Sequence, residues 1–288
     1  SLAPRASNTW PRARALPRQA ARLLRLQSSA GLTEDTMTIG DMDPETFRRS
    51  AHQLVEWISD YLAGGSDHRP VLSQVKPGDI RKALPSKAPE HGEPIERILE
   101  DFERILMPGI TQWNHPAFFA YFNSTGSGPG VLGEFLTAAL NQQAMLWRTS
   151  PAATELEEVA TGWLRELLGL PEPFEGVIND SGSSSTFHAL LAAREAAIPG
   201  VRLHGLSAPL DVPRLRVYCS ELTHSSVDKA LMALGMGHAA LRKIPVDDAY
   251  RMRPDALENA IAEDRAAGHL PVAVVATVGT TSAGSVDP

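Results

Sequence analysis

The sequence contains a single cysteine, Cys219, and this scarcity excludes a disulfide framework within the chain and a cysteine-rich metal site. We predict no metal site, and one thiol fits a reducing compartment, so we expect a cytoplasmic protein. No apolar run approaches the roughly 20 residues that span a bilayer, and we therefore expect no membrane partner.

Clusters of basic residues are also lacking in the part that is expected to fold, and the net charge is -7 with a pI near 5.7. Such a surface cannot neutralise a run of phosphates, so a nucleic-acid partner is not expected. Small molecules are the expected partners. The 288 residues, 43% of them hydrophobic, can bury a substantial core as one large domain or two modest ones.

Residues 1–36 differ from the rest, because six arginines precede the first acidic residue, Glu34. An Arg-rich, acid-poor start is typical of a transit peptide. The alternative, which we favour, is a non-native leader upstream of Met37. In either case we expect this segment to be disordered and exclude it from the fold.

Residues 37–110 predict two helices with a long connection. Asp43-Pro44-Glu45 is a typical helix start, with a side-chain acceptor at the cap and proline in the first turn. Apolar residues at helical spacing follow as far as Gly64-Gly65, and a second helix is predicted over 95–106 after an extended, proline-rich stretch. Two such helices make a poor core by themselves and need a larger body or a partner subunit to pack on.

After Ser150 the pattern alternates between helices and apolar strands. Helices are predicted over 151–168, 184–197, 225–236 and 254–267, and strands over 176–179, 215–220, 240–246 and 272–278. Apolar strands that alternate with helices indicate an α/β fold, with a mostly parallel sheet covered by helices on both faces.

Three polar stretches follow predicted strands, at the carboxyl ends where open α/β sheets bind ligands. The first is Asp180-Ser181-Gly182-Ser183-Ser184, which either caps a helix or holds a phosphate at the helix start. The second contains His224, and the third is Gly279-Thr280-Thr281-Ser282. Each is a weak signal alone, but together they suit a flat phosphorylated cofactor.

Five aromatic residues lie within ten positions of the stretch "QWNHPAFFAYFNS", between Trp113 and Phe122. We interpret this stretch either as hydrophobic core or as an aromatic-lined substrate pocket. The pattern of residues does not separate these two interpretations.

The motifs "HPAFFAYFNS", "GVINDSGSSSTFHALLAAR", "THSSVDKA" and "VVATVGTTSAGSVDP" resemble those of the group II pyridoxal-phosphate-dependent amino-acid decarboxylases, most closely the members that act on aromatic amino acids. The resemblance covers roughly residues 42–288. It implies the type I, aspartate-aminotransferase-like fold, incomplete at the C-terminus. It also implies that 37–110 is a helical segment embracing the partner in a homodimer, and that 111–288 is the first part of the large cofactor-binding domain.

The resemblance also implies residue roles. Gly182 and Ser183 would bind the phosphate of pyridoxal 5'-phosphate, His224 would stack on its ring and act in catalysis, and Thr281 would lie near the cofactor. Ser124, together with Trp113 and Phe122, would contact the amino-acid substrate. Asn123 stands where the family usually has proline, and Asn179-Asp180 stands where it commonly has Gln-Gly. These departures affect the assignment of the substrate more than the assignment of the family.

The reaction implied is decarboxylation of an L-amino acid, expected to be aromatic, to an amine and carbon dioxide. The family's lysine that forms the Schiff base with the cofactor follows a histidine, and none of the lysines here does: Lys76, Lys82, Lys87, Lys229 and Lys243. We therefore expect this chain to be an N-terminal fragment of a carboxy-lyase, inactive by itself.

Other functions remain open at this point. Within the same fold, a glutamate decarboxylase, an aminotransferase or a carbon–carbon lyase is possible. A serine hydrolase using Ser181 or Ser183 with His224 is disfavoured, because no GxSxG motif occurs. A non-catalytic homologue that binds a partner through its N-terminal helices is a third class.

Overall fold

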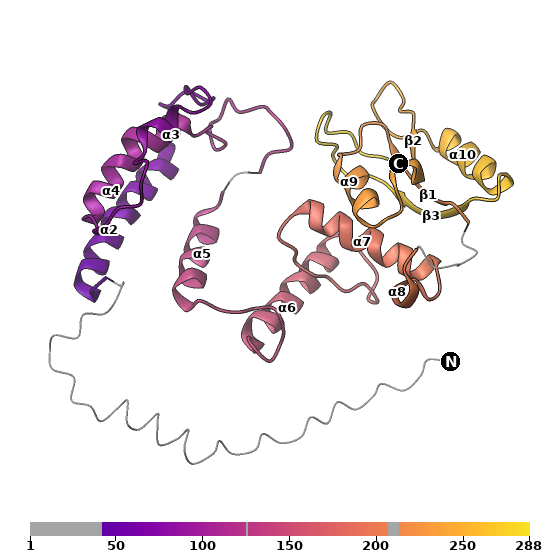
Figure 1. Ribbon diagram of the computed structural model, residues 1–288, viewed down its shortest axis with the longest axis horizontal. Helices are drawn as coiled ribbons and strands as arrows, with labels where there is room; N and C mark the ends of the chain where they lie inside the picture. Colours follow the sequence, from indigo (N-terminus) through magenta and orange to yellow (C-terminus); the bar gives the residue numbers. More distant parts are fainter. Residues whose placement is uncertain (1–41, 125, 207–212) are drawn as a thin grey trace, which may run out of the picture.

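The computed structural model describes residues 42–124, 126–206 and 213–288. The predicted leader, 1–36, lies outside the described residues. The N-terminal helices lie together, apart from the sheet, with α5 and α6 between the two groups (Figure 1). Among the described residues, no helix is long and apolar enough to cross a membrane.

Helix α2 (Pro44–Asp60) begins as predicted, because Asp43 Oδ1 accepts hydrogen bonds from the backbone N–H groups of Glu45 and Thr46 at 3.0 and 2.9 Å. A π-helical turn, η1 (Tyr61–Gly65), follows it, and Gly64 within this turn has φ 112°, a conformation that favours glycine. The chain therefore turns where the Gly64-Gly65 pair indicated.

The stretch between the two long N-terminal helices is not wholly extended, since it contains the short helix α3 (Asp79–Ala83). Helix α4 (Ile95–Asp101) continues through η2 (Phe102–Leu106) and η3 (Met107–Gly109). The Trp57 ring stacks on Tyr61 at 5.4 Å and meets Phe102 edge-on at 5.3 Å, so α2 packs against η2, the continuation of α4, through aromatic rings.

Helix α5 (Gly128–Leu140), which we did not predict, precedes α6 (Pro151–Leu167), which we did. Neither helix contains a buried residue. Their apolar side chains are exposed to solvent, Leu136 by 65% and Trp163 by 62%. The apolar face of α6 therefore exists, but the described residues do not cover it.

The sheet has three parallel strands in the order β2-β1-β3: β1 (Leu215–Ser220), β2 (Leu241–Ile244) and β3 (Leu270–Val275). Val217 in the central strand pairs with Leu241 on one side and Ala273 on the other. Helices connect the strands: α7 (Gly182–Ala197) and α8 (Val201–His204) precede β1, α9 (Ser226–Ala233) and η4 (His238–Ala240) join β1 to β2, and α10 (Pro254–Ala266) joins β2 to β3.

Both faces of the sheet carry helices, as predicted, because side chains of a strand alternate between its faces. Val217 and Cys219 pack with Leu190 of α7 and Leu231 of α9 on one face. Tyr218, between them in sequence, packs with Ile244, Met252 and Ala260 on the α10 face. Cys219 is a buried core residue, and its burial raises the pKa of the thiol.

The strand predicted over 176–179 is wrong. Val177 and Ile178 are 70% and 65% exposed, and no strand among the described residues pairs with them. The Ile178 N–H instead donates to Glu157 Oε1 at 2.7 Å. An apolar run forms a strand only beside a partner with free backbone groups, which the described part of the chain does not supply here. Strand β3 also ends earlier than predicted, at Val275.

Candidate cofactor and substrate site

The start of α7 carries two of the predicted cofactor residues. Ser181 is its N-cap, with Oγ accepting from the Ser184 N–H at 3.2 Å. Gly182 and Ser183 are the first two residues of the helix, both exposed, and a Cβ at Gly182 would meet no atom within 4 Å. Backbone N–H groups in a first helical turn have no partner within the helix. Ser181 therefore caps the helix, whereas Gly182 and Ser183 leave the helix start open to solvent.

A cavity of about 260 Å³ lies between α7 and α9. Ser183, Ser184 and His188 line it from α7, and Ser226 and Lys229 line it from α9. The predicted site residues His224 and Thr281 are not part of its lining. Sequence reasoning missed His188 and Lys229, although the spacing of Ser184 and His188 on one helix places both on one face.

His224 follows β1 and leads into α9. Its ring is exposed, and Nδ1 accepts a hydrogen bond from the Ser226 N–H at 3.2 Å. An acceptor nitrogen carries no proton, so the neutral ring has its proton on Nε2. The histidine thus caps α9 with one nitrogen and leaves an N–H donor for a ligand on the other.

The loop after β3 is a tight hairpin. Val278 and Val286 form an antiparallel bridge, and the N–H groups of Gly279 and Thr280 both donate to the Ser285 carbonyl, at 3.0 and 2.9 Å. Thr280 is buried, and its hydroxyl lies 2.9 Å from that of Ser285. Thr281, the predicted cofactor residue, remains partly exposed at the tip.

Asp287 anchors this hairpin to the rest of the fold. Its carboxylate accepts hydrogen bonds from the Met252 N–H at 2.7 Å and from the Thr277 N–H at 2.9 Å. The side chain is buried, so both bonds are shielded from water. The position of Thr281 is therefore set by the body of the domain.

The aromatic segment contains both buried and exposed rings. Phe118 is buried, whereas Phe122 is 66% exposed. Trp113 stacks on Tyr121 at 5.6 Å with an interplanar angle of 14° and is half-exposed. Ser124 is exposed. One ring thus belongs to the core, and the three residues that we assigned to the substrate, Trp113, Phe122 and Ser124, remain accessible.

Phe122 also connects this segment to the hairpin. A Cβ built on Gly279 would lie 2.6 Å from Cε2 of the Phe122 ring. Two segments about 155 residues apart in the chain therefore meet. Phe122, a predicted substrate residue, lies against the hairpin that carries Thr281, a predicted cofactor residue. This contact had no signal in the sequence beyond the glycine itself.

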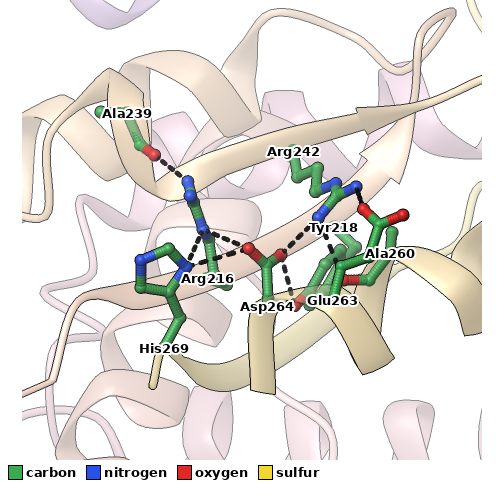
Figure 2. Close-up of polar contacts among 8 residues, drawn as sticks. All are labelled: Arg216, Tyr218, Ala239, Arg242, Ala260, Glu263, Asp264 and His269. Carbon is green, nitrogen blue, oxygen red and sulfur yellow. Dashed lines mark hydrogen bonds and ion pairs between the residues drawn. The ribbon is translucent and has the colours of Figure 1, made fainter. Parts of the chain in front are cut away.

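A buried polar network lies on the opposite, α10 face of the sheet (Figure 2). Asp264 accepts a hydrogen bond from the Tyr218 hydroxyl at 2.9 Å and pairs with Arg216 at 3.0 Å and Arg242 at 3.1 Å. His269 Nδ1 lies 3.0 Å from the same carboxylate. Because the network faces away from α7 and α9, we assign it to stability.

This network shifts two pKa values. Burial and the hydrogen bond to Asp264 raise the pKa of Tyr218 to about 12. Burial alone would raise the pKa of Asp264, but hydrogen bonds from His269, Tyr218 and Arg242 and the charge of Arg216 outweigh it and lower that pKa to about 2. Among the described residues, no group of three or more His, Cys, Asp or Glu side chains could hold a metal ion.

Comparison with known proteins decides the family. The family model described as "Pyridoxal-dependent decarboxylase conserved domain" matches residues 77–288. The chain belongs to this family. The pyridoxal-dependent decarboxylases use pyridoxal phosphate, and the open helix start at Gly182 and Ser183 fits a phosphate group.

The chain is similar to several members of the family. It is 41% identical to the aromatic-L-amino-acid decarboxylase of Mus musculus over 256 residues, which cover 85% of this chain and 52% of that protein. It is 40% identical to the phenylacetaldehyde synthase of Arabidopsis thaliana over 255 residues, 86% of this chain and 51% of that protein. The chain thus spans about half the length of these relatives.

A solved structure shows the same architecture. The tryptophan decarboxylase of Catharanthus roseus, in complex with L-tryptophan, aligns with a TM-score of 0.78 at 36% identity, over 86% of this chain and 54% of that one. The type I fold expected from the resemblance is therefore confirmed for the described part of the decarboxylase, which holds a parallel sheet and its covering helices.

Proposed function

We propose that the complete protein decarboxylates an aromatic L-amino acid to its amine and carbon dioxide. The observation that carries this proposal is the family match over 77–288 together with about 40% identity to relatives named for aromatic substrates or products. The positions of His224 after β1 and of Thr281 after β3 support it, because ligands of open α/β sheets bind at the carboxyl ends of the strands.

The residues of this chain would bind and orient. Pyridoxal phosphate, when bound, supplies the electron sink for loss of the carboxylate. The N–H groups of Gly182 and Ser183 and the Ser183 hydroxyl would hold the phosphate at the positive end of the α7 dipole. His224, held by the Ser226 N–H, would stack on the cofactor ring and present its Nε2 proton to the substrate. Thr281 would lie beside the cofactor.

Trp113, Phe122 and Ser124 would form the substrate side of the site. An aromatic substrate gains most from exposed rings and a small number of polar groups that fix its orientation. Ser124 is exposed and contributes a hydroxyl group. We therefore assign the aromatic rings to affinity and the Ser124 hydroxyl to orientation.

The test is carbon dioxide release by the complete gene product, saturated with pyridoxal phosphate, from a panel of amino acids. Release from tyrosine, tryptophan or phenylalanine is the expected result. Release from glutamate alone would overturn the aromatic assignment, and a folded protein that shows no visible absorbance of bound cofactor would overturn the cofactor assignment. His224→Gln should lower the rate by at least about a hundredfold, since it removes a group that touches both cofactor and substrate.

A second product class is favoured by one observation, the 40% identity to phenylacetaldehyde synthase. The same reactions should therefore be analysed for both amine and aldehyde. Amine as the main product supports the decarboxylase assignment, whereas aldehyde as the main product supports the alternative.

We also propose that this 288-residue chain has no decarboxylase activity by itself. The support is that none of its lysines follows a histidine, and that Lys243 is already paired with Asp228 at 3.0 Å. The isolated chain, assayed beside the complete protein, should release no carbon dioxide. Turnover by the isolated chain would contradict this.

We further propose a cytoplasmic homodimer that binds neither nucleic acid nor membrane. Residues 37–110 would embrace the partner, and 111–288 would form the first part of the large domain. The exposed apolar faces of α2 and α5 support this, as does the net charge of -7. Sedimentation of the complete protein should give twice the monomer mass, and cell fractionation should recover it in the cytosol. An active monomer or a membrane-bound pool would contradict the proposal.

A further inference from the structure

The contact between Phe122 and Gly279 is closer than any side chain on residue 279 would allow. A Cβ at Gly279 would lie 2.6 Å from Cε2 and 2.9 Å from Cζ of the ring, distances that real Cβ atoms do not tolerate. Gly279 also has φ 88°, in the left-handed region that favours glycine. The tip of the ring therefore occupies the space that a side chain would fill.

The backbone on the Phe122 side is held in place by its neighbours. The Asn123 Nδ2 group donates to the Trp113 carbonyl at 2.8 Å, and the Tyr121 ring stacks on the Trp113 ring. Tyr121 has φ 60°, a left-handed conformation that a non-glycine residue adopts only where other contacts hold it. Asn123, which replaces the proline of the family, thus supplies a hydrogen bond that fixes the direction of Phe122.

The Gly279 side is equally well held. Two N–H groups of the hairpin share the Ser285 carbonyl, and Asp287 ties the hairpin to Met252 and Thr277. The Phe122 ring therefore rests on a hairpin that is hydrogen-bonded to the rest of the domain; we call its contact surface at Gly279 the seat of the ring. Ser124 lies two residues after Phe122, and Thr281 lies two residues after Gly279.

We propose that Phe122 is a positioning residue, whose ring, seated on Gly279, sets the spacing between the segment that carries Ser124 and the hairpin that carries Thr281. The significance for catalysis rests on the proposed function, because it assumes that Ser124 faces the substrate and Thr281 the cofactor. The mechanical coupling does not depend on that assumption. It follows from the contact and from the anchoring on each side of it.

The coupling is tested first without cofactor or substrate, by hydrogen exchange of the complete apo-protein measured by mass spectrometry. Phe122→Ala should raise exchange in peptides from both 113–124 and 277–287, although these segments are far apart in sequence. Phe119, three residues away and 91% exposed, supplies the matched control, and Phe119→Ala should leave the hairpin unchanged. Faster exchange confined to 113–124 would overturn the coupling.

Gly279→Ala tests the same coupling from the hairpin side. The added methyl group should displace the ring and raise exchange in 113–124. In the Phe122→Ala background the methyl group has space, so the additional effect of Gly279→Ala on 113–124 should largely disappear. Additive effects of the two substitutions on hydrogen exchange would show that Phe122 and Gly279 do not act through their contact. Because Phe122 is 66% exposed, its removal leaves open surface, and the variants should fold.

Kinetics of the cofactor-loaded protein test the catalytic part. Phe122 is also one of the residues that we assign to the substrate, so the kinetic test uses Gly279. Gly279→Ala should raise KM for the aromatic amino acid about tenfold with a smaller change in kcat, because it displaces the Phe122 ring and loosens substrate placement. In the Phe122→Ala background the same substitution should leave KM unchanged. If the unsubstituted protein releases no carbon dioxide, the proposed function fails while the exchange result stands. If it does, and Gly279→Ala leaves KM unchanged, the positioning role fails.

Discussion

At the scale of single residues, two serines of one loop have different partners. Ser181 Oγ caps α7, whereas Ser183 is exposed and its hydroxyl accepts no hydrogen bond from the described residues. The helix cap and the hydroxyl that we propose for the phosphate are therefore different side chains. The sequence could not separate them, because both need a small hydroxyl residue at a helix start.

Substitution separates the two roles. Ser181→Ala should lower the free energy of unfolding of the apo-protein by about 1 kcal/mol, as expected for a lost N-cap. Ser183→Ala should leave that stability unchanged and weaken pyridoxal phosphate binding about tenfold, the value of one hydrogen bond to a charged group. Urea denaturation and cofactor titration measure the two effects. Equal effects of both substitutions on both quantities would contradict the division.

At the scale of elements, α9 is held to the sheet by its buried face. Leu231 is fully buried against β1 and α7, whereas Met232, its neighbour, is 53% exposed. Leu231→Ala should lower the free energy of unfolding by about 3 kcal/mol, from lost burial and the cavity that remains. Met232→Ala is the matched control and should cost less than about 0.5 kcal/mol. Similar midpoints of denaturation for the two variants would refute this packing.

Helix α10 is attached through charge as well as through apolar contacts. Asp264 is buried and pairs with Arg216, Arg242 and Tyr218. Asp264→Asn should lower the free energy of unfolding by about 3 kcal/mol, because it leaves the Arg216 guanidinium group without its carboxylate, whereas Arg242 keeps Glu263. Glu258→Gln, on the exposed side of the same helix, is the control. Thermal melting would show the contrast, and an unaffected Asp264→Asn variant would argue against the network.

The same network sets the pH range of stability. The pKa of Asp264 is lowered to about 2, so the unfolded state binds its proton first, and stability should decrease as the pH falls from about 4 to 2. The pKa of Tyr218 is raised to about 12, so stability should also decrease as the pH rises from about 10 to 12. In Asp264→Asn, the acid-side slope should be smaller when chemical denaturation is repeated across pH. An unchanged slope would assign acid sensitivity to other carboxylates.

At the scale of the whole molecule, apolar surface is more extensive than a free monomer usually exposes. Leu132, Leu136 and Leu140 of α5 are each more than 60% exposed. Leu136→Asp should weaken self-association of the complete protein by at least about tenfold, because it places a charge in an interface that we expect to be apolar. Asn259→Asp adds the same charge to exposed α10 and should leave association unchanged in sedimentation experiments. Unchanged association in both variants would place the dimer interface elsewhere.

Local patterns alone predicted much of this fold. The bounds of β1 were correct, and α2, α6, α7 and α10 were predicted to within a few residues, because caps and hydrophobic spacing are properties of neighbouring residues. Helix α5 was missed because Gly128, Gly130 and Gly133 suggest a loop. The strand over 176–179 was wrong because strand formation depends on a partner that the local pattern does not specify.

The sequence by itself determined the family and the candidate residues, since motif spacing and residue type carry that information. Only the tertiary structure decided which serine caps α7, which nitrogen of His224 is engaged, and that Phe122 rests on Gly279. The first two are contacts between near neighbours in the chain, where the residue types allow more than one arrangement. The third joins residues that are far apart in sequence, and such a contact depends on the packing of the whole fold.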